Sequence, residues 1–249
     1  MTYTEEELQH LSDQFERQDP HKTNVDLALE VLRWTRDAFE PSEVTLATGF
    51  GAEGVVLIDM LASLKVSIPI FYLDTEVLFP ETYQLRDQLE ERYGIRFHKY
   101  RPALSLSSQA ALYGENLWAR NPDLCCAIRK VEPLKEALKD RAAWITAIRR
   151  EQSPLRKNAR IVEQDRVHGL IKINPLVTWT KPEVWRYIAE HHVPYNPLYD
   201  RGYASIGCIH CTTPVGPGED ERAGRWRGFQ QTECGLHVAN SQLQKERAE

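Results

Sequence analysis

The chain has 249 residues, of which 42% are hydrophobic and 27% are charged, and its formal net charge at pH 7 is −5. A chain of this length and composition can bury a large core as an ordinary globular protein, and its acidic balance argues against a general nucleic-acid-binding protein. The sequence has no apolar run as long as the roughly 20 residues of a membrane-spanning helix, and its acidic, polar N-terminus is unlike a signal peptide. We therefore expect a cytoplasmic protein that binds neither nucleic acid nor membrane.

The first 40 residues are expected to form a helical N-terminal segment. Thr4 and Glu7 fit a capping box at the start of a helix over residues 4–18. Asn24 is the expected cap of a second helix, because the apolar residues that follow it recur at helical spacing.

From residue 43 on, apolar strands alternate with helices. Strands are predicted at 43–48, 68–74, 95–100, 142–148 and 170–176, and helices at 55–64, 80–93, 123–139 and 180–192. This alternation predicts an α/β fold with a doubly wound, mostly parallel sheet. No linker or repeat interrupts the pattern before about residue 200, so we expect one domain over residues 1–215. Glycine and proline become dense after that point, and residues 216–249 are expected to form a mobile tail.

Polar loops follow three of the predicted strands at their carboxyl ends, where doubly wound sheets bind ligands. The first is the Gly-rich turn over 49–54, in which backbone N–H groups can hold a phosphate or sulfate. The second begins at Asp74, and the third carries Arg149 and Arg150. The turn matches neither the dinucleotide-binding nor the Walker A motif, so an ordinary strand–helix turn is an equal alternative for that loop taken alone. The three loops together favour a pocket for a nucleotide-like anion.

Four of the five cysteines occur as two pairs. Cys125 and Cys126 are adjacent, and Cys208 and Cys211 form a CxxC motif. A disulfide framework is not expected in a reducing compartment. Zinc sites usually use two spaced C-x₂₋₄-C pairs, whereas adjacent thiolates more easily bind two different irons of a cuboidal cluster. The spacing therefore favours a 4Fe–4S cluster, with zinc as the alternative.

The fifth cysteine, Cys234, lies near the end of the chain. Arg225, Arg227 and His237 are close to it in sequence. Nearby cations lower the pKa of a thiol and make its thiolate available as a nucleophile. An incidental surface thiol is the alternative interpretation.

Six motifs, taken together, resemble one known family. They are TGFGAEG, YLDTEVLFPETY, CCAIRKVEPL, WITAIRREQS, GCIHCT and ECGLH, and they span about residues 44–237. This set resembles the assimilatory sulfonucleotide reductases, and among them the iron–sulfur type that reduces adenylyl sulfate (APS). The resemblance implies a fold related to the adenine nucleotide alpha hydrolases and a 4Fe–4S cluster on Cys125, Cys126, Cys208 and Cys211.

The same resemblance implies a mechanism centred on Cys234. Its thiolate attacks the sulfur of APS, AMP leaves, and an S-sulfocysteine remains on the enzyme. Reduced thioredoxin, a separate protein, then releases sulfite for sulfate assimilation and cysteine biosynthesis. The tail is expected to close for the first step and open for the second.

Further site residues follow from the resemblance. Lys130 and His237 join Cys234 as catalytic residues. The expected substrate-binding residues are Thr48, Gly49, Phe50, Gly51, Glu53, Leu73, Arg129, Arg149, Arg150, Arg225 and Arg227. The cations in this set would offset the repulsion between a thiolate and an anionic sulfuryl group. The chain departs from the family pattern at Gly54, where many members carry an acidic residue.

Three other functions remain as alternatives at this stage. The chain could reduce 3′-phosphoadenylyl sulfate (PAPS), alone or as well as APS. It could be a PP-loop ATP pyrophosphatase with a four-cysteine metal site, although the turn lacks the Ser-Gly-Gly and Asp-Ser of that loop. It could also be a zinc-bound interaction module without catalysis, which would leave Cys234 without a role. Assembly into a homo-oligomer is left open.

Overall fold

The computed structural model describes residues 3–17, 21–229 and 233–237. The chain divides into two compact units. Unit 1 comprises Met1–Phe71, Gln88–His98 and Asp140–Tyr195, and unit 2 comprises Tyr72–Asp87, Lys99–Lys139 and Asn196–Glu249. Among the described residues, no helix is both long and apolar enough to cross a membrane. The expected single domain over residues 1–215 stays a prediction.

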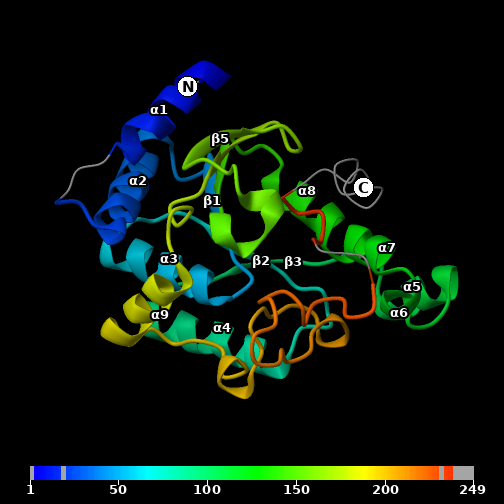
Figure 1. The fold of residues 1–249 in the computed structure, drawn as a ribbon. Helices are drawn as coiled ribbons and strands as arrows, with labels where there is room; N and C mark the ends of the chain where they lie inside the picture. Colours follow the sequence, from blue (N-terminus) through cyan, green and yellow to red (C-terminus); the bar gives the residue numbers. More distant parts are fainter. Residues whose placement is uncertain (1–2, 18–20, 230–232, 238–249) are drawn as a thin grey trace. The chain divides into compact units, whose positions relative to one another are not determined.

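A six-stranded sheet has the order β3-β2-β1-β4-β6-β5 (Figure 1). Its strands are β1 (Val44–Ala47), β2 (Ile70–Leu73), β3 (His98–Tyr100), β4 (Ala143–Ile145), β5 (Val162–Asp165) and β6 (Leu170–Ile173). β1 pairs in parallel with β2 and β4, and β4 in parallel with β6, whereas β5 pairs antiparallel with β6. The predicted doubly wound, mostly parallel sheet is confirmed, and the antiparallel strand β5 is an addition to the prediction.

The helices of unit 1 have caps that the sequence predicts in part. They are α1 (Glu5–Glu16), α2 (Asn24–Ala38), α3 (Ala52–Ser63) and α9 (Lys181–Glu190). Thr4 and Glu7 form the predicted capping box of α1. The predicted cap of α2 was wrong by one residue: Thr23 accepts the Asp26 N–H at 3.1 Å. The Asn24 amide instead donates to Glu183 of α9 at 2.9 Å, so this side chain joins two helices.

The core of unit 1 forms around β1 and α3. α3 is apolar on nearly all sides, and its buried residues include Val55, Val56, Leu57 and Met60. A helix that is apolar all round must be covered on all sides, and only residues 48–51 separate α3 from β1. α1 and α2 lie side by side (Figure 1), with Phe15 packed edge-on against Trp34 at 5.9 Å between ring centroids.

Unit 2 contains a helical run that the sequence predicts as one helix over residues 123–139. The run is α7 (Pro122–Cys126), a π-helical turn η1 (Ala127–Val131) and α8 (Glu132–Leu138). The short helices α5 (Leu106–Tyr113) and α6 (Leu117–Arg120) precede it. α4 (Pro80–Tyr93) starts in unit 2 and ends in unit 1, with the predicted boundaries.

Part of the expected mobile tail is held by defined contacts within unit 2. Arg225 pairs with Thr212 in an antiparallel bridge, and Trp226 and Glu233 are both 2% exposed. The short turns η4 (Tyr199–Arg201) and η5 (Ile209–Cys211) precede this segment. Residues 230–232 and 238–249 of the expected tail lie outside the described residues.

Candidate active site

The Gly-rich turn of unit 1 joins the carboxyl end of β1 to the N-terminus of α3. The Thr48 hydroxyl accepts the backbone N–H of Phe50 at 3.0 Å. Phe50 has a φ of 56° and its side chain is buried, 5.1 Å from the ring of Phe97 in an edge-on contact. A bulky residue at positive φ is strained, and such strain is typical of ligand-binding turns. Gly51 is the N-cap of α3 and, because it has no side chain, it provides no side-chain capping bond to the first turn.

Gly54 has a local structural reason for replacing the acidic residue of the family pattern. A Cβ at position 54 would lie 2.7 Å from the Thr48 hydroxyl oxygen, which is closer than such atoms approach one another. Any side chain here would force Thr48 to move and would disturb its bond to Phe50. The glycine and the Thr48 conformation therefore belong together in this chain.

Arg149 and Arg150 of unit 1 are both bound by carboxylates. Arg149 is 1% exposed, donates to Glu53 at 2.7 Å and also pairs with Glu151. Arg150 donates to both carboxylate oxygens of Glu16 in α1, at 2.6 and 3.0 Å. Arg149 therefore ties the loop after β4 to the first turn of α3, whereas Arg150 ties its loop to α1.

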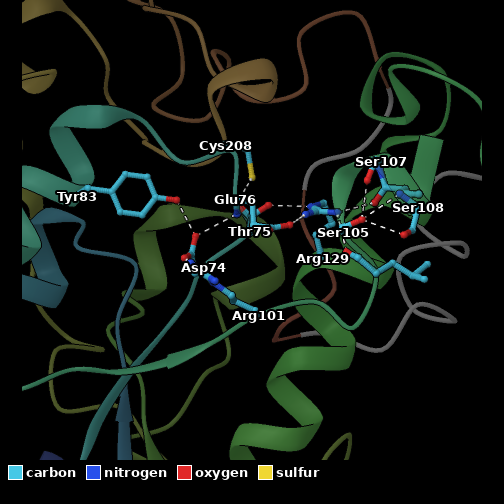
Figure 2. A network of polar contacts seen from close by, with 12 residues as sticks. Asp74, Thr75, Glu76, Tyr83, Arg101, Ser105, Ser107, Ser108, Arg129 and Cys208 are labelled. Atoms are coloured by element: carbon cyan, nitrogen blue, oxygen red, sulfur yellow. Dashed lines mark hydrogen bonds and ion pairs between the residues drawn. The ribbon is translucent and has the colours of Figure 1, made fainter. Parts of the chain in front are cut away.

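In unit 2, the chain that follows Leu73 at the end of β2 is fixed by Asp74 (Figure 2). This carboxylate accepts from the Tyr83 hydroxyl at 2.6 Å, the Glu76 N–H at 3.1 Å and Arg101 at 3.2 Å. Burial alone raises the pKa of Asp74, but these hydrogen bonds outweigh it and lower the pKa. Asp74 is thus held as a carboxylate that shapes the loop.

Arg129 is the centre of a second network in the same loop region (Figure 2). Its guanidinium is 1% exposed, donates to the Thr75 carbonyl at 2.8 Å and Gln109 at 3.0 Å, and pairs with Glu76. Glu76 has a φ of 61°. The guanidinium of Arg129 therefore makes its hydrogen bonds within the protein. In this structure the predicted substrate-binding residue holds the loop at Thr75 and Glu76 in place.

The four paired cysteines interact with one another electrostatically in unit 2. These four cysteines form no disulfide with one another, and Cys125, Cys126 and Cys208 are buried while Cys211 is half-buried. Burial first, and then the charges of Cys126 and Cys208, raise the pKa of Cys125 to about 11. Burial first, and then Cys208, Cys126 and Cys125, raise the pKa of Cys211 to about 12. The two pairs, more than 80 residues apart in sequence, therefore lie close enough to interact.

Lys130 is a buried cation in this region. It is 8% exposed. Burial alone lowers the pKa of its ammonium, but the negative charges of Cys208, Cys126 and Cys234 outweigh burial and raise it. The predicted nucleophile and the predicted catalytic lysine are therefore close enough to interact. His237 and the half-buried Cys234 belong to the same unit.

The arginines near Cys234 differ in their surroundings. Arg227 is exposed and pairs with Glu219 at 3.0 Å. Arg225 lies 4.4 Å from the ring centroid of Trp226, and Arg222 pairs with the buried Glu233 at 3.0 Å. Trp226 and Glu233 were not predicted as site residues. Trp226 lies in the arginine-rich run RAGRWR over residues 222–227, and this run is the signal that could have indicated the tryptophan.

A cavity of about 620 Å³ in unit 1 lies away from the Gly-rich turn. Its lining includes Ser42, Pro69 and Arg141, which precede β1, β2 and β4. These are the amino ends of parallel strands, whereas ligands of doubly wound sheets bind at the carboxyl ends.

Comparison with known proteins places the chain in one family. A family model described as the phosphoadenosine phosphosulfate reductase domain matches residues 43–214. An adenosine 5′-phosphosulfate reductase of Salinibacter ruber is 47% identical over 210 residues, which cover 84% of this chain and 83% of that protein. Another, of Shouchella clausii, is 44% identical over 236 residues, which cover 93% of this chain and 98% of that protein.

Solved structures share the fold described above. A phosphoadenylyl-sulfate reductase from Candida auris, solved as a phosphate complex, matches with a TM-score of 0.73 and 33% identity, over 86% of this chain and 99% of that chain. An FMN adenylyltransferase from Candida glabrata has a TM-score of 0.55 and 14% identity over 96% of this chain and 89% of that chain, which shows the fold alone. The predicted adenine nucleotide hydrolase-like fold is confirmed. The chain belongs to the phosphoadenosine phosphosulfate reductase family, as its motifs predict.

Proposed function

We propose that this protein is an oxidoreductase that reduces APS to sulfite and AMP in cytoplasmic sulfate assimilation. The similar proteins of Salinibacter ruber and Shouchella clausii are named as reductases of this substrate. The observation that supports it most directly is the interaction of Cys234 with the buried cation of Lys130. A thiol nucleophile beside a fixed cation is the pair needed to attack an anionic sulfuryl group.

The first step is the transfer of the sulfuryl group to Cys234. The Cys234 thiolate forms a bond to the sulfur of APS, and the bond between that sulfur and the phosphate oxygen breaks. AMP leaves with the electron pair, and an S-sulfocysteine remains. Lys130 offsets the negative charge that gathers on the sulfuryl oxygens, because its ammonium is already buried and needs no rearrangement.

The second step uses a protein dithiol, which we take to be reduced thioredoxin. One of its thiolates attacks the sulfur of Cys234 and forms a mixed disulfide, and sulfite leaves with the electron pair. The second thiol of the partner resolves this disulfide and returns Cys234 to its thiolate. The dithiol thus supplies the two electrons of the reduction. Assembly of this protein into a homo-oligomer is compatible with the scheme and is not required by it.

The nucleotide is assigned to the loops that follow β1 and β2. In this assignment the residues Thr48 to Glu53 bind the phosphate and ribose, and the Leu73 backbone binds the adenine. The strained Phe50 and the Thr48 bond that fixes it support a turn built for close approach of a ligand. Arg149 holds Glu53 in place and so acts on the turn through that carboxylate.

We assign Cys125, Cys126, Cys208 and Cys211 to a 4Fe–4S cluster. The donor set fits: as bare thiols, Cys125 and Cys211 resist ionisation beside their neighbours, and a bound cationic metal group would reverse that. Among the described residues, no three histidine, cysteine or acidic groups are arranged to hold a single metal ion. The adjacent pair Cys125 and Cys126 suits two irons of a cuboidal cluster better than one tetrahedral ion. When bound, the cluster would tune the charge near Lys130.

Iron analysis tests the cluster assignment. Anaerobically purified protein is expected to contain about four irons per chain and to be brown, whereas Cys208→Ser is expected to lose most of the iron. The matched control is Cys234→Ser, which makes the same substitution at a cysteine outside the two pairs and should keep the iron content. Stoichiometric zinc without iron in the parent protein, or full iron content in Cys208→Ser, would contradict the assignment.

Transfer of labelled sulfur tests the proposed function. Anaerobic protein without thioredoxin is offered ³⁵S-labelled APS and, separately, labelled PAPS, and the label is mapped to peptides. Label from APS on the Cys234 peptide is the expected result, and label from both substrates would make the enzyme dual-specific. No label from either would refute the mechanism and favour the ATP pyrophosphatase alternative.

A further inference from the structure

Trp226 is a buried tryptophan whose indole N–H has no hydrogen-bond partner among the described residues. The side chain is 2% exposed and its Nε1 atom is buried. Buried donors without acceptors are rare in native proteins, because each has lost its bonds to water without replacement. Two other buried tryptophans of the chain do have acceptors: Trp144 donates to Asp165 at 2.9 Å, and Trp179 to the Asn24 carbonyl at 3.1 Å. The Trp226 N–H therefore points to an acceptor on a bound molecule.

Three cations gather around the ring of the same tryptophan. The guanidinium carbon of Arg225 lies 4.4 Å from its centroid, that of Arg222 5.8 Å and the Lys130 ammonium 5.9 Å. The Nε of Arg225 is also buried without a partner among the described residues. Glu233 pairs with Arg222 and offsets one of the three charges. An anion that joins this group would relieve the remaining repulsion.

The backbone of Trp226 has a strained conformation. Trp226 has a φ of 46°, which a bulky residue rarely adopts. The backbone N–H of Trp226 donates to the Cys211 carbonyl at 3.0 Å, and its backbone carbonyl accepts from the Phe229 N–H at 2.9 Å. These two bonds hold Trp226 beside the loop that carries Cys208 and Cys211. Strain maintained by surrounding contacts is typical of functional sites.

We propose that Trp226 contacts the sulfuryl group that is transferred to Cys234, donating a hydrogen bond from Nε1–H to one sulfuryl oxygen. The ring at the same time keeps Lys130, Arg222 and Arg225 around that group. This inference rests on the proposed function. The sulfuryl group is favoured over the nucleotide phosphate because Lys130 also interacts with Cys234, which must touch the sulfur that it attacks.

The test measures binding without turnover, in the Cys234→Ser protein. Trp226→Phe keeps a ring for the cations but removes the N–H. We expect the affinity for APS to fall about tenfold, the effect of losing a hydrogen bond to a charged group. The affinity for AMP, which lacks the sulfuryl group, should stay within twofold, and the melting temperature should fall less than in the Trp179→Phe control, since the removed donor had no partner in the described chain. Calorimetry and thermal melts give all three values.

Trp179→Phe in the same background is the matched control. It leaves the Asn24 carbonyl without its indole donor, so it should lower the melting temperature and leave both affinities unchanged. An unchanged APS affinity in Trp226→Phe would overturn the inference, and so would an equal loss of APS and AMP affinity. Failure of the Cys234→Ser parent to bind APS would refute the proposed function itself, and this inference with it.

A second measurement needs no folded Trp226 variant. In ¹⁵N-tryptophan-labelled Cys234→Ser protein, the chain gives six indole N–H signals, one for each tryptophan. We expect one of them to shift on addition of APS and to respond much less to AMP. If no indole signal distinguishes the two ligands, the inference is wrong.

Discussion

Replacement of Cys234 by serine is expected to abolish sulfite formation while APS still binds. A serine hydroxyl is barely ionised at neutral pH, so it is a far weaker nucleophile than a thiolate. The oxygen is also smaller than sulfur and adds no bulk at this half-buried position. We expect sulfite formation with thioredoxin to fall at least about a thousandfold and the dissociation constant for APS to stay within about threefold. Steady-state sulfite assays and calorimetry measure the two quantities.

Cys234→Ala is the companion variant, because it removes the thiol without introducing a hydroxyl. Both variants should lose turnover equally and keep the iron content of the parent protein. Turnover above about one-tenth of the parent value in either variant would place the nucleophile elsewhere in the chain.

The alternation of strands and helices could be predicted from sequence because most strands are short apolar runs. β4 is buried along its whole length and α3 is apolar on nearly every side, so burial leaves a clear signal in both. β5 was missed because its sequence VEQD is polar in the middle, where the strand is only half-buried. The cap of α2 was misplaced because Asn24 and Thr23 are both good capping residues, and only the contact of Asn24 with Glu183 decides between them.

The π-helical turn inside the predicted helix over residues 123–139 ends shortly before a proline. Pro133 has no N–H, so it cannot bond to the carbonyl of Arg129 as a regular helix requires. The chain instead passes through a π-helical turn from Ala127 to Val131 before α8 begins. Arg129 and Lys130 are both buried in this turn, and π-helical turns are frequent at functional sites.

Sequence treats all the candidate arginines alike, whereas the structure separates them by their partners. Arg150 pairs with Glu16 across 134 residues, and Arg149 with Glu53 across 96 residues. Pairs so distant leave no local pattern in the sequence. Sequence made Cys234, Lys130 and the cysteine pairs candidates, because the motifs that contain them have a specific order and spacing, and the roles of these residues remain proposals. It did not identify Trp226, which is a candidate because its indole N–H has no partner within the described part of the chain and three cations surround its ring.

Replacement of Lys130 by methionine is expected to slow sulfuryl transfer about a hundred- to a thousandfold, the usual effect of removing one group that stabilises a developing anion. Methionine keeps most of the length and apolar volume of the lysine stem but has no charge. The buried ammonium interacts with the thiolates of Cys208, Cys126 and Cys234, so its loss leaves negative charge around the sulfuryl group without compensation. Rapid-quench measurement of label transfer to Cys234, without thioredoxin, isolates this step. The effect should appear mainly in the rate of transfer and less in the affinity for APS.

Lys135→Met is the matched control for Lys130→Met, because it makes the same substitution five residues later on the same helical run. Lys135 is exposed, and its ion pair with Glu132 lies at the surface, where such pairs contribute at most about 1 kcal/mol to stability. Its transfer rate should equal that of the parent protein. If Lys130→Met transfers the label within threefold of the parent rate, the cation does not act on the sulfuryl group. An effect confined to the release of sulfite by thioredoxin would assign Lys130 to the second step, and the stabilisation of the transferred group would then have to come from Arg222, Arg225 and Trp226 alone.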